Sequence, residues 1–306
     1  MKNNNPKGII LILIGMFIVS FMDATFKYIN TSVNLYEAYF VRTLISFGVI
    51  ASYLKITNKP IIFTTHYPLL TSVRVILFFF GFSSFYISLT IMPLATATAL
   101  FFASPFLITI FAIFFLKEEV GIRRWSAVII GFIGVYIILN PDFNDFDYLS
   151  LTPVLCAVCY ALSMIIIKKT SDKDDVYSQM FHFYIFAIII SLIIYFFIGD
   201  GQYNNFDYPA SQFILRKWFN NLEFSLPYMI FIGVIGATGF LCFFTAYRIA
   251  SPAVVSPFEY SILAWASLNG WIFFDEIPNQ RTFVGMILIV CGSIYCLLYT
   301  SDAADE

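Results

Sequence analysis

The chain is built from apolar stretches that are each long enough to cross a bilayer. Of its 306 residues, 60% are apolar and only 12% are charged, whereas a soluble domain carries about 25% charged residues. A spanning helix needs roughly 20 apolar residues. Ten such stretches can be placed, at about 8–28, 35–54, 69–90, 93–116, 124–140, 148–168, 177–198, 227–248, 252–274 and 281–299. Because lipid satisfies no backbone polar group, these stretches must be helical. The sequence predicts an all-α integral membrane protein with ten transmembrane helices.

The first stretch is expected to stay in the protein as a helix. It is too long for a cleaved signal peptide, has no small-residue cleavage site, and carries Asp23 and Lys27 near its end.

A long internal repeat divides the chain into two halves. Residues 81–136 return without a gap 158 positions later, and the landmark pairs are Gly81 with Gly239, Glu118 with Glu276, Arg123 with Arg281, and Gly134 with Gly292. A repeat unit with an odd number of passes must return inverted, and inverted halves around a midplane site are typical of secondary transporters. We therefore predict two inverted five-helix repeats, residues 1–140 and 141–299.

The distribution of positive charge predicts the orientation in the membrane. With a cytoplasmic N-terminus, the inside segments carry eleven basic residues: Lys2, Lys7, Lys55, Lys59, Lys117, Arg123, Arg124, Lys168, Lys169, Lys173 and Arg248. The outside segments then carry three: Arg216, Lys217 and Arg281. Cytoplasmic loops are enriched in Lys and Arg, so both termini are predicted to be cytoplasmic.

The last residues, 296–306, resemble the translation of an adapter used in preparing sequencing libraries. We expect this segment to be a non-native tail and leave it out of the reasoning on fold. Its three acidic residues move the formal charge from +1 to −2, so the acidic end is not interpreted as a binding site for a partner.

Several ionisable residues fall inside the apolar stretches, where a charge costs at least a few kcal/mol and tends to face the bundle interior. For Asp23, Arg42, Arg74 and Glu259, structural ion pairing and a role with substrate or protons both stay open. Asp23 and Lys27, four residues apart on one helix face, can pair with each other.

Glu118 and Glu276 occupy equivalent turns of the repeat. Each is followed five residues later by an arginine, Arg123 or Arg281. We interpret each pair as a salt bridge that staples a helical hairpin.

Motifs for enzymes and cofactors do not occur in the sequence. It contains no HExxH, GxSxG, GKS/T or DDxxD motif and only two histidines. The five cysteines lie in apolar stretches and are interpreted as small buried residues. We expect no catalytic residue, metal, cofactor or nucleic-acid partner. Without an ATP-binding motif, uphill transport would depend on an ion gradient or on exchange.

Four segments resemble those of EamA-domain proteins in the drug/metabolite transporter superfamily: Gly15–Lys27, Pro93–Ala99, Ser256–Tyr260 and Phe274–Pro278. The pattern is most similar to that of bacterial members related to S-adenosylmethionine uptake and riboflavin transport. The resemblance covers nearly the whole chain as two tandem units. It implies ten helices, cytoplasmic termini, and a central cavity walled by the stretches at 8–28, 69–90, 93–116, 148–168, 227–248 and 252–274.

By its helices, the resemblance implies a set of substrate-binding candidates: Asp23, Arg74, Tyr86, Phe102, Tyr160, Glu259, Tyr260 and Trp265. The leading hypothesis is a secondary transporter of a small organic metabolite that is amino-acid-, nucleoside- or vitamin-like. It would work by alternating access in a bacterial inner membrane, with the bilayer and a small solute as partners, as a monomer or homodimer. The alternatives are an integral-membrane enzyme for a lipid or isoprenoid substrate and a non-transporting receptor or scaffold.

Overall fold

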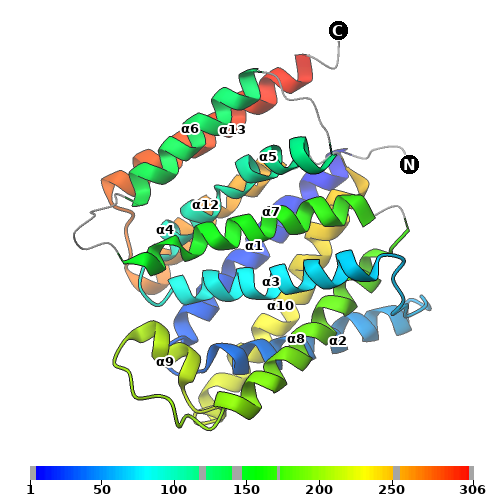
Figure 1. Ribbon diagram of the computed structural model, residues 1–306, viewed down its shortest axis with the longest axis vertical. Coiled ribbons are helices and arrows are strands. Elements are labelled where there is room, and N and C mark those ends of the chain that lie inside the picture. The colour runs from blue at the N-terminus through cyan, green and yellow to red at the C-terminus, as the bar shows by residue number, and fades with distance from the viewer. Residues whose placement is uncertain (1–4, 117–121, 140–146, 171–172, 251–255, 303–306) are drawn as a thin grey trace.

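A computed structural model describes residues 5–116, 122–139, 147–170, 173–250 and 256–302 (Figure 1). These ranges form helices and connecting segments and contain no strand. The elements are α1 (Asn5–Ile29), α2 (Leu35–Ile56), α3 (Pro68–Ser88), α4 (Leu94–Phe101), α5 (Ser104–Leu116), α6 (Ile122–Leu139), η1 (Tyr148–Leu151), α7 (Thr152–Thr170), α8 (Val176–Ile198), α9 (Pro209–Leu215), α10 (Leu222–Ile249), η2 (Ser256–Tyr260), α12 (Ser261–Phe274) and α13 (Gln280–Asp302).

Seven helical spans in the described part are long and apolar enough to cross a membrane, and two shorter apolar segments, Ile129–Leu139 and Gln280–Gly292, accompany them. The predicted all-α membrane class is therefore confirmed. Apart from the short helix α9, which lies between two expected stretches, each helix lies close to an expected stretch, because run length limits where a chain can be helical in lipid. The number of ten transmembrane helices remains a prediction.

Two expected spans are interrupted at corresponding positions. The stretch at 93–116 divides into α4 and α5, with the break at Phe102 just before Pro105. Proline has no backbone N–H to donate, so a helix tends to break in the turn before it. In the second half, η2 contains Pro257 and ends at Tyr260 before α12 begins. Phe102 and Tyr260 are equivalent positions of the 158-residue repeat.

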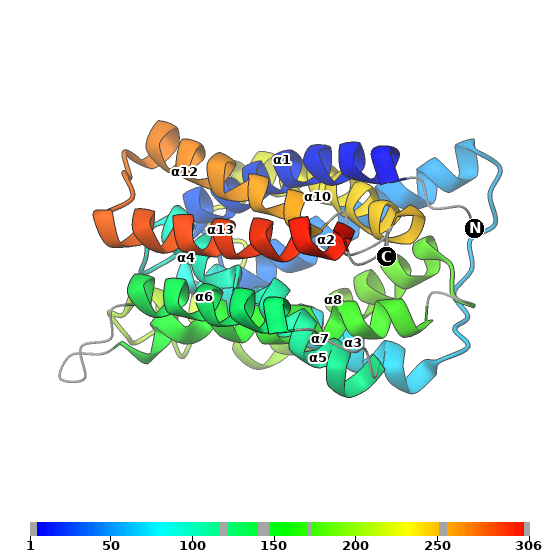
Figure 2. The same ribbon diagram turned by 90° about the horizontal axis from the view of Figure 1, so that it is seen from above.

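The helices of the two halves pack against each other in reciprocal pairs. Helix α1 packs on α10 and α12, while α7 packs on α3 and α5. Two further pairs, α2 with α8 and α6 with α13, join equivalent helices of the two halves. Figures 1 and 2 show α6 and α13 side by side along one edge of the bundle. The contacts of α1 with α10 and α12 in one direction therefore correspond to those of α7 with α3 and α5 in the other.

Glycines bring the paired helices into close contact. A Cβ atom on Gly285 of α13 would lie 2.7 Å from the carbonyl oxygen of Gly134 on α6, and one on Gly134 would lie 2.8 Å from the Gly285 carbonyl oxygen. Likewise, a Cβ on Gly81 of α3 would lie 2.7 Å from Cβ of Cys159 on α7. Small residues at such positions let membrane helices approach backbone to backbone.

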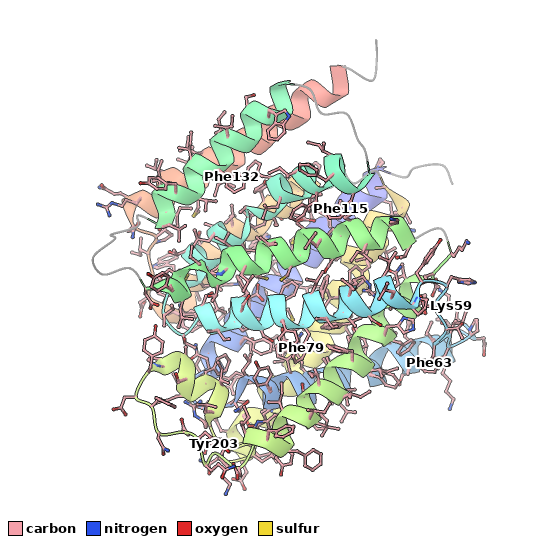
Figure 3. All side chains as sticks on the ribbon, viewed as in Figure 1. Lys59, Phe63, Phe79, Phe115, Phe132 and Tyr203 are labelled. Atoms are coloured by element: carbon pink, nitrogen blue, oxygen red, sulfur yellow. The ribbon has the colours of Figure 1, made fainter. Side chains whose placement is uncertain are left out.

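The two ends of the bundle are closed by different contacts. We call one the Lys27 end, where α1 ends and α13 begins, and the other the Asp174 end, between α7 and α8. In Figure 3, Tyr203 lies toward the first end, Lys59 lies at the second, and Phe79 lies between them. The candidate site described next lies on the helices that connect these ends.

Candidate functional site

A cluster of polar and aromatic side chains lies buried where α1, α2 and α3 meet. Asp23 and Arg42 are only 5% and 4% exposed. The hydroxyl of Tyr86 donates a hydrogen bond to Oδ1 of Asp23 at 3.2 Å, and the charges of Asp23 and Arg42 act on each other. Neither residue forms a salt bridge within the described part of the chain. We call Asp23, Phe26, Tyr39, Arg42 and Tyr86 the central cluster.

Aromatic rings surround the guanidinium of Arg42. Its Cζ lies 4.4 Å from the ring centroid of Tyr39, 5.3 Å from that of Phe26 and 5.9 Å from that of Tyr86. The rings of Phe26 and Tyr86 are stacked, with centroids 3.9 Å apart. Aromatic faces attract cations at these distances, so the cluster holds a positive charge beside a carboxyl group.

A second buried group joins the two broken helices. The hydroxyl of Tyr160 on α7 donates to Oε1 of Glu259 at 3.4 Å, and Glu259 is 1% exposed. The rings of Phe102 and Tyr260, the equivalent residues at the two breaks, have centroids 4.7 Å apart. Phe101 lies 5.2 Å from the ring of Tyr160. The interrupted segments therefore bring an acid and several rings together between the halves.

Six of the eight predicted site residues fall into these two groups, with Asp23 and Tyr86 in the first and Phe102, Tyr160, Glu259 and Tyr260 in the second. Arg74 lies apart, near the Asp174 end, where its Nη2 donates to the carbonyl oxygen of Gln179 at 3.0 Å. Trp265 is partly exposed on α12 and packs edge-to-face on Phe17 with centroids 4.9 Å apart. Their binding roles remain predictions.

Arg42 is the residue that the sequence-based candidate set omits. Its signal in the sequence is a lone arginine within an apolar stretch, which α2 then turns toward α1 and α3. The helices that lie beside α2 decide which neighbours Arg42 contacts. The apolar residues around Arg42 in the sequence do not indicate these neighbours.

An ion pair closes the Lys27 end. Lys27 Nζ lies 2.5 Å from Oε1 of Glu276 and also donates to the carbonyl oxygen of Met92 at 3.0 Å. The other oxygen of Glu276 accepts from the amide of Leu94 at 3.2 Å. Four segments are thereby joined: the end of α1, the turn after α3, the start of α4, and the turn between α12 and α13. We call these contacts the Lys27–Glu276 latch.

Two sequence-based interpretations of these charges are wrong. Lys27 pairs with Glu276 and not with Asp23, because the end of α1 lies against the α12–α13 turn. Glu276 consequently does not pair with Arg281, whose side chain is exposed. The corresponding interpretation for Glu118 lies outside the described residues.

The opposite end is held by Asp174. Its carboxylate accepts hydrogen bonds from the hydroxyl of Thr65 at 2.5 Å and from the backbone amide of His66 at 2.9 Å. Burial raises the pKa of Asp174, but these hydrogen bonds outweigh the effect and hold the pKa below its ordinary value. The loop before α3 is thereby joined to the turn before α8.

No group of three or more His, Cys, Asp or Glu side chains that could hold a metal ion occurs among the residues described. The two central groups offer hydrogen bonds, a cation surrounded by rings, and aromatic packing.

Comparisons with known proteins agree with this architecture. The model of the EamA-like transporter family matches residues 6–140 and 149–298. The S-adenosylmethionine uptake transporter of Rickettsia prowazekii is 28% identical over 95% of this chain and 92% of its own. The riboflavin transporter of Vibrio cholerae is 31% identical over 65% of this chain and 61% of its own, and the pseudopaline exporter of Pseudomonas aeruginosa is 23% identical over 94% of each. A crystal structure with 16% sequence identity has a TM-score of 0.64 and covers 96% of this chain and 98% of that one.

Proposed function

Because the chain belongs to the EamA-like transporter family, we propose that it is a secondary transporter that moves a small organic metabolite across a bacterial inner membrane by alternating access. Full-length relatives are named as transporters of such solutes, which supports the proposal. In this view the two matched stretches form inverted five-helix units, ten helices in all. The reciprocal packing of α1 on α10 and α7 on α3 supports that symmetry.

The proposed substrate is a zwitterion that carries a carboxylate and a positive group, as an amino acid or S-adenosylmethionine does. One observation carries this choice: Asp23 and Arg42 are both buried, and neither forms a salt bridge in the described structure. A buried charge is unfavourable unless a partner of opposite charge compensates it. A zwitterion brings both partners. Riboflavin carries neither charge, so the central cluster favours an amino-acid-like solute over a riboflavin-like one.

Alternating access requires that the two ends of the bundle open in turn. The Lys27–Glu276 latch joins segments of both halves at one end, and the distribution of Lys and Arg predicts that this end faces outward. We propose that the latch holds the outer end closed and breaks when the halves rock about the central cluster. Its residues lie at the meeting point of α1, α4 and α12, which must separate in such a motion.

Transport assays with purified protein in proteoliposomes test the proposal. Labelled S-adenosylmethionine, a panel of amino acids, and riboflavin are supplied on either side, and protein-free liposomes serve as the control. We expect saturable, protein-dependent flux of a zwitterion. Flux of riboflavin alone would contradict the substrate class, and no flux of any panel member in either direction would count against the proposed function.

A further inference from the structure

Arg42 differs from Arg74, which is also buried, in how its hydrogen-bond donors are used. Arg74 donates to the Gln179 carbonyl oxygen at 3.0 Å. In contrast, Nη1 of Arg42 contacts only the sulfur of Met22 at 3.4 Å, and its buried Nε has no partner in the described structure. A thioether is a weak acceptor. The guanidinium therefore keeps most of its hydrogen-bonding capacity although it is buried.

The surrounding rings explain how Arg42 can be fixed in place with its donors unused. A cation–π contact lies on the faces of Phe26, Tyr39 and Tyr86, whereas the N–H bonds of a guanidinium point outward in its own plane. The rings orient the cation without consuming a donor. An arginine prepared in this way matches the planar, two-pronged geometry of a carboxylate.

We infer that Arg42 binds the carboxylate of the transported solute and that Asp23 receives its positive group. Tyr86 joins the two positions, because its hydroxyl donates to Asp23 and its ring faces Arg42. The buried hydroxyls of Tyr39 and Tyr184 also lie close enough to Arg42 to interact with its charge, beside the hydroxyls of Ser83 and Ser46. They supply further donors to an anion bound there. This inference rests on the proposed function and adds the residue that selects the substrate.

A purely structural Arg42 makes the opposite prediction for stability, and this separates the two roles without knowledge of the solute. If Arg42 awaits a carboxylate, its guanidinium has no ion-pair partner in the empty protein, and Arg42→Met replaces it by an apolar side chain that packs among the same rings. Removing one of two interacting buried charges strands the other, and Asp23 lies near Arg42. The substitution is therefore made in the Asp23→Asn variant, where replacing the remaining charge by an apolar side chain is expected to be neutral or stabilising. If the ring contacts of Arg42 hold the fold together, the same substitution destabilises it.

The stability test compares the Tm of purified Asp23→Asn with the Tm of Asp23→Asn/Arg42→Met and of the control Asp23→Asn/Arg281→Gln, in detergent without added solute. Arg281→Gln also removes a guanidinium, but an exposed one. We expect the Tm of Asp23→Asn/Arg42→Met to equal that of Asp23→Asn or to rise by about 2–4 °C. A Tm lowered by about 4 °C or more, with the control unchanged, would overturn the inference.

The binding test uses S-adenosylmethionine and its decarboxylated analogue on the wild type and Arg42→Gln. We expect Arg42→Gln to weaken binding of the first by about 10- to 100-fold and to leave the second nearly unchanged, because only the first carries the carboxylate. Equal weakening of both, or equal binding of both by the wild type, would overturn the inference. If the wild type binds neither, the proposed substrate class fails, and the stability test alone decides the role of Arg42.

Discussion

The charged side chains at the Lys27 end form an ion pair, whereas those in the central cluster form none in the described structure. Lys27 and Glu276 form an ion pair at 2.5 Å. Lys27 also donates a hydrogen bond to the carbonyl oxygen of Met92, and Glu276 accepts one from the amide of Leu94. Asp23 and Arg42 are more deeply buried, yet neither has an ion-pair partner in the described structure. Charges that form an ion pair within the protein close the bundle, and buried charges without such a pair suit a solute that supplies the partners.

This comparison explains why burial alone does not identify a site. Arg74 is 1% exposed, but the carbonyl oxygen of Gln179 accepts a hydrogen bond from its Nη2. Arg42 is buried to a similar degree with its Nε unused. The two arginines differ in whether their hydrogen-bond donors have acceptors. A buried donor without an acceptor costs free energy, so such a donor is a candidate to bind a ligand.

The largest expected effect is that of Asp23→Asn on transport. The amide keeps the shape of the side chain and its contact with Tyr86 but removes the negative charge. We expect initial uptake of the zwitterionic substrate to fall by at least about tenfold, while membrane abundance stays the same. Quantitative uptake with immunoblotting measures both. Glu223→Gln, which neutralises an exposed acid, is the matched control. Wild-type flux in Asp23→Asn would remove this acid from the mechanism.

A smaller effect is expected when the latch is broken. Glu276→Gln removes the charge that Lys27 faces, and Lys27→Met removes the other partner. Since the pair is mostly buried, with side chains 10% and 26% exposed, we expect a coupling energy of about 1–2 kcal/mol in a double-mutant cycle. Thermal unfolding in detergent measures it. If the losses of stability in the two single variants add up to the loss in the double variant, the side chains of Lys27 and Glu276 do not stabilise each other.

An uncharged contact between the halves provides a reference for these effects. A Cβ on Gly285 would lie 2.7 Å from the Gly134 carbonyl oxygen and would also clash with Ile138. We expect Gly285→Ala to destabilise the protein by about 1–3 kcal/mol. Gly48→Ala is the control, since nothing lies within 4 Å of a Cβ there. Equal stability of the two variants would indicate that α6 and α13 do not pack closely.

The smallest effect concerns pH and the Asp174 end. Because the pKa of Asp174 in the folded protein lies below its ordinary value of 3.8, its ionised form stabilises the fold above about pH 4. That contribution is lost as the pH falls from 3.8 through the folded pKa. We expect the wild type to lose stability in this window and Asp174→Asn to lose less. Thermal unfolding at pH 3–6 tests this, and identical pH profiles would contradict it.

The positions of the helices were largely predictable, and the partners of their side chains were not. The expected stretch at 35–54 became α2, Leu35–Ile56, because the length of an apolar run limits where a helix can cross lipid. The break at Phe102 could be anticipated from Pro105. In contrast, Lys27 pairs with a glutamate 249 residues away, and spacing along one helix had suggested Asp23.

The sequence by itself determined the membrane class, the approximate helix boundaries and the family, because these follow from composition, run length and motifs within single segments. Only the tertiary structure decided which charges are compensated. Helices that are apolar on every side carry no stripe that indicates which face meets which neighbour. The ring contacts of Arg42, drawn from α1, α2 and α3, and the Lys27–Glu276 latch therefore appear only once the helices are packed.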